Sequence, residues 1–364
     1  MKKRIVILSQ VMYPNLRPRA QRTTELAKEL ARQGYEVIVY ALLGDYDYTD
    51  FIKDTGVCVK NLGNTNWGLN NSDEAIKQTA IHHVLNRTVG KYFWLPDRVL
   101  IPMVKKAIMK EGHIDCLITI AVPHVIHYAA SLADLSKVVC WIADCGDPFM
   151  LNPFSKHPKY FEKYERKWCE KCNYITVPVE EAINGYYPEY KNKIKVIPQG
   201  FDFSSTKIAE YKKNEVPTFA YIGAVYPGNR DPKLFLEYLK NIDMNFKFKI
   251  FGSSWAYFEP YNVLLNNRLE YCGKMPREQL IYELSKCDFL ININNSSGVQ
   301  IPSKLIDYYL SNRPILSITT NLRQDEIDNF HQFVSGNYEN QTEAYNVENY
   351  NIVNVANKFI SLLL

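Results

Sequence analysis

Short apolar runs alternate with helical patterns along almost the whole chain, and this alternation limits the possible folds more than any other feature. The first apolar run covers Arg4–Leu8, a helical pattern follows over residues 22–33, Gly34 ends it, and a second run covers Glu36–Ala41. Such runs, separated by amphipathic helices, are typical of βαβ units with parallel strands. The sequence therefore predicts an α/β protein.

The units fall into two series, and 364 residues are too many for one comfortable core. The first series predicts further strands at residues 116–120, 138–143, 174–177 and 194–197, with helices at 99–111, 124–133, 160–171 and 180–187. The second predicts strands at 218–222, 246–251, 269–272, 289–293 and 315–318, with helices at 231–240, 276–286 and 303–312. We predict domains 1–200 and 201–350, a hinge at residues 198–200, and a terminal helix within 351–364 that returns to the first domain. Residues 44–100 are less regular and are expected to contain an insertion.

Composition excludes several classes of protein. Hydrophobic residues make up 46% and charged residues 23%, which are ordinary globular values. No apolar run is long enough to span a membrane, and the run at Arg4–Leu8 is too short for a signal peptide, so we expect a cytoplasmic protein. Eight cysteines form no disulfide pattern, and Cys169 and Cys172 have the spacing of only half a zinc site, so no metal is expected.

Charge is uneven along the chain. Residues 1–200 hold 27 Lys and Arg against 21 Asp and Glu, whereas the whole chain has a net charge of only +4. A basic N-terminal half favours an anionic lipid surface, including the inner face of the cytoplasmic membrane, or a phosphorylated acceptor. An ordinary solvated surface explains it equally well. No basic stripe points to nucleic acid.

The sharpest site signal lies in residues 293–318. A predicted strand ends, a polar loop carries Ser296, Gly298 and Val299, and a proline then opens a helix with Ser303 and Lys304 in its first turn. Free N–H groups at such a turn bind anions, and a lysine there is unfavourable for the helix dipole unless an anion is bound. Asp307 follows on the same face, about 4.5 Å along the axis. This spacing suits a diphosphate and its ribose, and an ordinary surface Lys–Asp pair is the alternative.

Three more loops follow predicted strands of the second half and carry glycine. Gly223 opens a loop that ends in Arg230, a residue suited to phosphate. The other two loops hold Gly252 with Ser253, and Gly273 with Lys274 and Met275. Each glycine alone can be a simple turn, but three such loops are consistent with one ligand crossing that edge of the sheet.

Candidates in the first half also follow strands. Arg17, Arg19 and Arg22 lie in and after the first loop and either hold an anionic ligand or are solvated. His124 follows the strand at 116–120, and His127 lies one turn later. Asp147 follows the strand at 138–143 and either orients an acceptor hydroxyl or caps a loop.

At this point the sequence resembles the group 1 (family 4-type) glycosyltransferases of the GT-B fold. The matching segments are residues 302–308 with 313–315, residues 196–202, and residues 221–223; residues 144–148 with 152–153, 96–97 and 115–119 resemble a bacterial branch that makes surface polysaccharides. The resemblance implies two Rossmann-like domains facing a central cleft, with donor binding by the second and acceptor binding by the first.

The resemblance also implies residue roles and shows departures. Members usually carry two glutamates eight positions apart; Asp307 occupies the second place and Val299 the first. The arginine usual after the first glycine is Ala224, which leaves Arg230 as the best match to a second basic residue. Where the branch often has Phe-Arg, Cys145 and Gly146 stand here.

The function implied is transfer of a sugar from a nucleotide-diphosphate sugar to a saccharide or lipid-linked saccharide, with retention and without a metal or other cofactor. Arg230 and Lys304 would stabilise the leaving diphosphate, and His124 and Asp147 would act on the acceptor or sugar. Two alternatives remain open: a nucleotide-sugar 2-epimerase of the same fold, and a non-catalytic nucleotide-sugar-binding protein. A Rossmann dehydrogenase is disfavoured because no G-x-G-x-x-G follows a strand.

Overall fold

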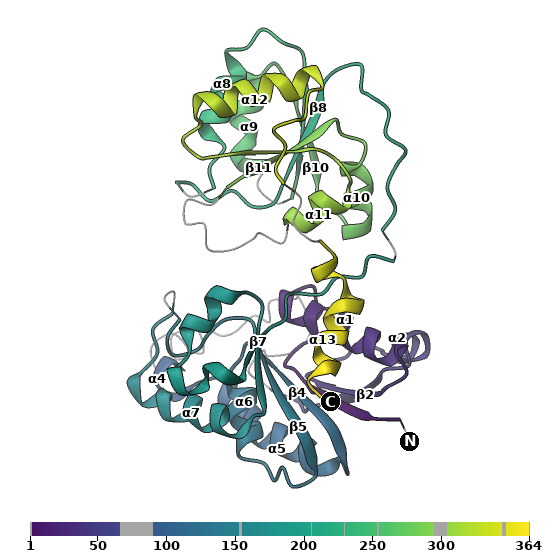
Figure 1. The fold of residues 1–364 in the computed structure, drawn as a ribbon, viewed down its shortest axis with the longest axis vertical. Helices are drawn as coiled ribbons and strands as arrows, with labels where there is room; N and C mark the ends of the chain where they lie inside the picture. Colours follow the sequence, from purple (N-terminus) through teal and green to yellow (C-terminus); the bar gives the residue numbers. More distant parts are fainter. Residues whose placement is uncertain are drawn as a thin grey trace. The chain divides into compact units, whose positions relative to one another are not determined.

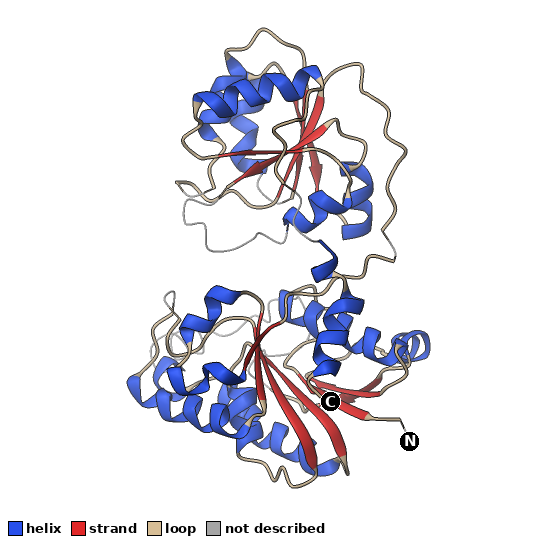
Figure 2. Ribbon diagram, viewed as in Figure 1, coloured by secondary structure: helices blue, strands red, loops and turns tan. Residues whose placement is uncertain are grey.

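The computed structural model describes residues 2–65, 90–152, 155–204, 206–228, 230–252, 255–294, 304–343 and 347–363. The chain forms two compact units, one of Met1–Asp202 with Asn349–Leu364 and one of Phe203–Glu348 (Figure 1). In each unit, the described residues form one parallel sheet with helices packed against it (Figure 2). The predicted α/β class with two parallel sheets is confirmed.

The sheet of the first unit has the strand order β3-β2-β1-β4-β5-β6-β7. All its neighbouring strands pair in parallel. The strands are β1 (Arg4–Leu8), β2 (Glu36–Ala41), β3 (Cys58–Asn61), β4 (Ile114–Ala121), β5 (Val138–Cys145), β6 (Tyr174–Val177) and β7 (Ile194–Val196). The order reverses beside β1, and in such sheets ligands bind beyond the carboxyl ends of the strands near this point.

Apolar residues of this sheet face two cores, one on each side. Val6 and Leu8 of β1 belong to one core, and Ile5 and Ile7 to the other, because successive strand side chains point to opposite faces. The first core is covered by α5 (Leu100–Lys110), α6 (Val125–Ser131) and α7 (Glu162–Lys171). The second is covered by α1 (Pro18–Arg32) and by the C-terminal helix α13 (Ile352–Ser361), which lies beside α1 (Figure 1).

Shorter elements complete the first unit and border its pockets. They are α2 (Thr49–Thr55), α4 (Lys91–Phe93), and the 3₁₀ turns η2 (Asp97–Val99), η3 (Lys159–Phe161), η4 (Glu180–Gly185) and η5 (Pro188–Lys193). Strand β3 and helix α2 fall in the stretch that sequence patterns predict as irregular. Because β3 is a half-exposed edge strand, it lacks the continuous apolar run of the central strands.

The second unit has a sheet in the order β10-β9-β8-β11-β12. Its strands are β8 (Thr218–Ile222), β9 (Lys247–Phe251), β10 (Leu269–Gly273), β11 (Phe289–Ile293) and β12 (Ile315–Ile318). Phe219 and Phe248 belong to a core that includes residues of α8 (Lys233–Lys240), α9 (Trp255–Leu264) and α12 (Gln324–Ser335). On the other face, Ala220 and Ile222 pack with α10 (Arg277–Leu284) and α11 (Lys304–Leu310). A 3₁₀ turn, η6 (Val347–Tyr350), follows.

Helix α1 begins four residues earlier than predicted. Pro18 occupies its first turn, where the missing N–H of proline costs nothing. As a result Arg19 and Arg22 both lie on the helix, one turn apart. Among the described residues, no helix combines the length and the apolar character needed to cross a lipid bilayer.

Candidate functional site

Three glycines lie together at the carboxyl edge of the second sheet. Gly223 follows β8, Gly252 follows β9, and Gly273 ends β10. The N–H of Gly252 donates to the carbonyl of Gly273 at 2.8 Å, and the N–H of Gly223 donates to the carbonyl of Phe251 at 3.2 Å. A Cβ on Gly252 would lie 3.3 Å from the carbonyl oxygen of Gly223, and both glycines have positive φ. Because glycine has no Cβ, the backbones at the ends of these neighbouring strands can approach each other closely.

Tyr308 holds α11 against this edge. Its buried hydroxyl donates to the carbonyl of Ile291 in β11 and accepts the N–H of Ile222, the last residue of β8, both at 2.9 Å. These bonds fix the helix that carries Lys304 and Asp307 next to Gly223. Tyr308 lies in the segment 302–308 that carries the resemblance, but no role was predicted for it; the available signal was a tyrosine within an apolar stretch, whose hydroxyl needs a partner once buried.

Lys304 is a buried cation at this edge. It is 7% exposed, and its Nζ has no hydrogen-bond partner among the residues that the structure describes. Its Cδ lies 3.8 Å from the position of a Cβ on Gly223, and its Nζ lies 4.8 Å from the centre of the Tyr221 ring. Burial lowers the pKa of Lys304 to about 7, and the charge of Arg230 contributes in the same direction. A buried cation without a counter-charge is costly, so an anion here would stabilise it.

Arg230 lies on the turn that follows β8. It forms an antiparallel bridge with Tyr226, with N···O distances of 2.9 and 3.1 Å, and its guanidinium lies 5.7 Å from the centre of the Tyr226 ring. On the loop after β10, Lys274 is exposed. Met275 is partly buried and packs against the core that contains Ala220 and Ile222. Besides burial, the charge of Arg230 lowers the pKa of Lys304, so these two residues bring two positive charges to one region of the unit.

Asp307 has a partner that the sequence did not suggest. Its Oδ1 accepts a hydrogen bond from Nε of Arg277 at 2.6 Å, with the two side chains 16% and 28% exposed. Burial raises the pKa of Asp307, and Arg277 opposes this shift. The available signal was an arginine in the first turn of the helix that follows β10. The predicted residues Ser253, Ser296, Gly298, Val299 and Ser303 lie outside the described residues.

In the first unit, a pocket of about 510 Å³ lies beyond β4 and β5. His124 and Asp147 line it, together with Trp94, Phe149 and Phe161. The His124 ring stacks on Phe149 with ring centres 4.8 Å apart, and its buried Nδ1 has no hydrogen-bond partner within the described parts of the chain. Burial holds the pKa of His124 well below its ordinary value, so the imidazole is neutral at physiological pH. It can exchange hydrogen bonds with a ligand but brings no charge.

His127 is fully buried beneath this pocket. Its Nδ1 lies 2.7 Å from Oγ1 of Thr119, its Nε2 lies 3.3 Å from Sγ of Cys145, and burial lowers its pKa to about 3. Thr119 in turn accepts the indole N–H of Trp141 at 2.9 Å. His127 therefore joins β4, β5 and α6 internally, and a ligand reaches it only through its neighbours.

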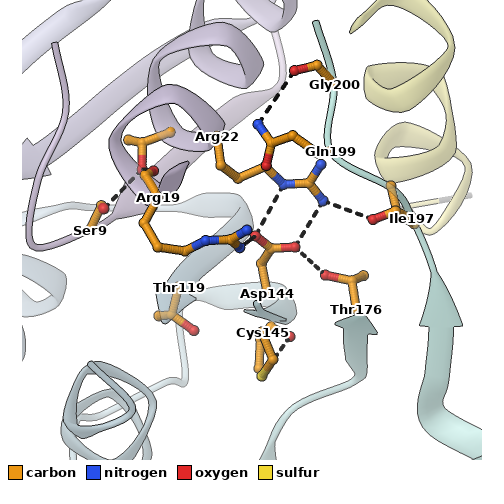
Figure 3. Close-up of polar contacts among 12 residues, drawn as sticks. Ser9, Arg19, Arg22, Thr119, Asp144, Cys145, Thr176, Ile197, Gln199 and Gly200 are labelled. Carbon is orange, nitrogen blue, oxygen red and sulfur yellow. Dashed lines mark hydrogen bonds and ion pairs between the residues drawn. The ribbon is translucent and has the colours of Figure 1, made fainter. Parts of the chain in front are cut away.

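The three predicted arginines occupy very different environments, and Figure 3 shows two of them, Arg19 and Arg22. Arg22 is 2% exposed; its guanidinium donates to both carboxylate oxygens of Asp144, at 2.9 and 3.2 Å, and to the carbonyls of Ile197 and Pro198. Arg19 is partly exposed and lies 3.7 Å from Asp144. Arg17 is exposed just before α1.

Asp144 is a buried carboxylate held between Arg22 and Arg19. Burial would raise the pKa of Asp144, but Arg22 and Arg19 together with Thr176 hold it below its ordinary value, so it stays ionised. Thr176 also donates to Oδ1 of Asp144 at 2.7 Å. One carboxylate thus faces two guanidinium groups. Arg19 fits here because residue 146 is glycine: a Cβ there would lie 2.9 Å from Cζ of Arg19.

The sequence matches no protein-family model and none of the curated proteins, whereas solved structures match over the whole chain. HepE of Anabaena, crystallised with UDP and glucose, has a TM-score of 0.58 at 11% identity, covering 99% of each chain. A glycosyltransferase from Rickettsia africae has a TM-score of 0.61 at 12% identity, covering 100% of this chain and 98% of its own. The lipopolysaccharide outer core galactosyltransferase WaaB has a TM-score of 0.60 at 12% identity, covering 99% of each chain.

This chain has the GT-B fold. At these identities the similarity establishes the fold alone, and membership of the family 4-type group stays a prediction. Within the GT-B fold, the two candidate regions are the cationic edge around Lys304 in the second unit and the pocket around His124 in the first.

One group of described side chains has the atoms to hold a metal ion. The potential ligand atoms of His124, His127 and Cys145 all lie within 4.8 Å of one another, and all three residues are buried. Both nitrogens of His127 are already hydrogen-bonded, to Thr119 and Cys145. The contacts of His127 thus account for its own polar atoms without an ion, and the expectation that the protein needs no metal stays a prediction.

Proposed function

We propose that this protein is a glycosyltransferase that moves a sugar from a nucleotide-diphosphate sugar to a saccharide or lipid-linked saccharide. The observation that carries the proposal is Lys304, a buried ammonium without a hydrogen-bond partner among the described residues, next to the backbone of Gly223. The fold adds support, because structures similar to this chain include proteins crystallised with UDP and with UDP-glucose.

The two cations suit the leaving group of this reaction. As the bond between the anomeric carbon and the diphosphate oxygen breaks, negative charge grows on the diphosphate, and preorganised cations stabilise that charge. Lys304 and Arg230 supply them. The acceptor oxygen forms the new bond to the anomeric carbon, and its proton passes to an oxygen of the departing diphosphate. We propose that the sugar keeps its anomeric configuration.

Asp307 is proposed to bind the ribose of the donor. Arg277 occupies Oδ1 and orients the carboxylate, and the other oxygen is then suited to accept a ribose hydroxyl. Asp307→Ala should reduce the preference of the protein for UDP over pyrophosphate in calorimetry. The control is Asp243→Ala, which removes an exposed carboxylate elsewhere in the same unit. Equal preference in Asp307→Ala and the native protein would remove the ribose role.

The acceptor is proposed to bind in the 510 Å³ pocket of the first unit. Neutral His124 would accept a hydrogen bond from a hydroxyl of the acceptor or the sugar, and Asp147 would orient the acceptor hydroxyl. Arg17 and Arg19 are proposed to contact an anionic part of the acceptor. Arg22 and His127 would act as positioning residues, because each is buried and engaged by neighbours.

Transfer is proposed to need no metal, since Lys304 and Arg230 supply positive charge for the diphosphate. Activity should therefore persist in EDTA. Complete inhibition that is reversed by a divalent cation would contradict this part of the proposal and would direct attention to His124, His127 and Cys145.

The decisive experiment joins binding and turnover. Thermal-shift measurements with UDP, GDP, ADP and CMP would identify the base, and the matching nucleotide sugars would then be tested with a panel of saccharide acceptors. Binding with transfer supports the proposal. Isomerisation of the donor without acceptor would identify an epimerase, and binding without turnover would identify a sensor. Absence of nucleotide binding would overturn the proposal.

The biological setting follows from the sequence resemblance. It supports a place in the synthesis of a capsule, O-antigen or exopolysaccharide, in the cytoplasm at the inner face of the membrane. Deletion of the gene should remove one sugar from such a glycan. An unchanged glycan would contradict this biological role but would not contradict the proposed transfer reaction.

A further inference from the structure

Two histidines and one cysteine meet at the start of α6. His124 lies immediately before this helix and His127 lies in its first turn, and residues three positions apart share one face of a helix. Cys145 ends β5, and its Sγ lies 3.3 Å from Nε2 of His127. A ring nitrogen of each histidine and the cysteine sulfur all lie within 4.8 Å of one another. Three metal-binding side chains from two strand ends therefore share a small volume.

The spacing of these atoms suits zinc. Zinc binds histidine nitrogen at about 2.0 Å and cysteine sulfur at about 2.3 Å in a tetrahedron, so neighbouring ligand atoms lie about 3.5 Å apart. The contact of 3.3 Å between Sγ of Cys145 and Nε2 of His127 is close to that value. Magnesium and calcium prefer oxygen ligands, whereas imidazole and thiolate favour zinc and related transition metals.

The surroundings of His127 orient its ring as a metal ligand is usually oriented. Its Nδ1 lies 2.7 Å from Oγ1 of Thr119, which also accepts the indole N–H of Trp141. When Nδ1 carries the proton, His127 donates to Thr119, and the lone pair of Nε2 is free for an ion beside Cys145. Histidine ligands usually donate their second ring N–H to a partner of this kind. Both contacts of His127 are therefore compatible with a bound ion.

Two further groups around the cluster favour a cation. Nδ1 of His124 has no hydrogen-bond partner among the described residues, although the residue is only 6% exposed. A buried nitrogen of this kind is costly unless a ligand uses it. Glu165 is fully buried, and its charge acts on Cys145, so a carboxyl group lies within electrostatic reach of the cluster. Cys145 itself would bind a metal as the thiolate and release its proton to solvent.

We propose that His124, His127 and Cys145 bind a single zinc ion. Three protein ligands leave a fourth position for water or for a ligand in the adjoining pocket, which His124 lines. The ion belongs to the first unit, whereas Lys304 and Arg230, the charges proposed to act on the diphosphate, belong to the second. Zinc binding is thus separate from the proposed metal-free transfer, and it can be tested without turnover.

The test replaces zinc by cobalt, because the absorption spectrum of cobalt reports its ligands. Untagged protein is freed of metal with a chelator, kept reduced, and titrated with Co²⁺. We expect one ion per chain and a thiolate-to-cobalt charge-transfer absorption in the near ultraviolet, which added Zn²⁺ should remove by displacing the cobalt. Cys145→Ser should abolish this absorption. His124→Ala should weaken zinc binding by at least about tenfold, since loss of even an outer partner of a metal ligand costs this much.

The control is Cys58→Ser, which removes an exposed cysteine of the same unit and should change neither the spectrum nor the zinc affinity. Three results would overturn the inference: no charge-transfer absorption in the native protein, absorption that survives Cys145→Ser and is lost in Cys58→Ser, and native zinc affinity in His124→Ala. If circular dichroism shows that Cys145→Ser does not fold, His124→Ala decides, because His124 lines a pocket. Absence of UDP binding would remove the proposed function and leave the zinc site standing.

Discussion

Among the residues that the structure describes, each unit buries one long cation, and the two cations differ in what surrounds them. Arg22 in the first unit is 2% exposed and donates to both oxygens of Asp144 and to two backbone carbonyls. Lys304 in the second unit is 7% exposed, and its ammonium has no hydrogen-bond partner among the described residues. A buried cation with its charge fully compensated holds the fold together, whereas one without a partner points to a ligand.

The largest effect should come from breaking the compensated site. Arg22→Met leaves Asp144 buried with Arg19 and Thr176 as its polar partners among the described residues, and should lower the free energy of unfolding by about 3–5 kcal/mol in urea titrations. UDP affinity should change little. The double variant with Asp144→Leu should lose less than the sum of the single changes. Simple additivity would show that Arg22 and Asp144 do not act as a pair.

Lys304→Met should have the next largest effect, and on binding. Removal of the cation should weaken UDP binding about 100-fold, which is about 2.7 kcal/mol, in calorimetry. Lys240→Met, an exposed lysine at the end of α8 in the same unit, is the control and should bind normally. If both variants bind UDP as the native protein does, Lys304 is an ordinary buried lysine and the comparison fails.

The same Lys304→Met variant should be more stable than the native protein without ligand. Loss of a buried cation that has no hydrogen-bond partner among the described residues should raise the free energy of unfolding by about 1–3 kcal/mol at pH 6. The folded-state pKa of Lys304 is about 7, below its ordinary value, so its cost to stability is greatest below pH 7 and shrinks as the pH rises toward 10. A loss of stability at pH 6 would mean that a partner compensates this ammonium in the folded protein.

The smallest predicted effect concerns pH. Lys304 must be protonated to pair with a diphosphate, and its pKa without ligand is about 7. Between pH 7.5 and 8.5, where UDP is fully ionised, affinity should fall roughly tenfold. Lys304→Arg keeps its charge over this range and should bind with little pH dependence. A falling affinity in Lys304→Arg as steep as in the native protein would assign the titration to another group.

Sequence periodicity determined the secondary structure of this chain to a large extent. Predicted bounds of β1, β2, β6, β8, β11 and β12 agree with the structure residue for residue. Central parallel strands are covered on both faces, so they appear as unbroken apolar runs with polar ends. The edge strand β3 is covered less, carries Lys60 and Asn61, and was missed for that reason.

The features of the candidate site can be divided in the same way, into those that the sequence predicted and those that it did not. The position of Gly223, Gly252, Gly273 and Lys304 after strands was visible in the sequence, since the ends of parallel strands share one edge of a sheet. The difference between Arg22 and Lys304 was not visible in the sequence. Asp144, the partner of Arg22, is 122 residues away along the chain. The sequence by itself determined which residues reach the edges of the sheets, because that depends on local periodicity. Tertiary structure decided which of their charges are compensated, because compensation depends on partners that are distant along the chain.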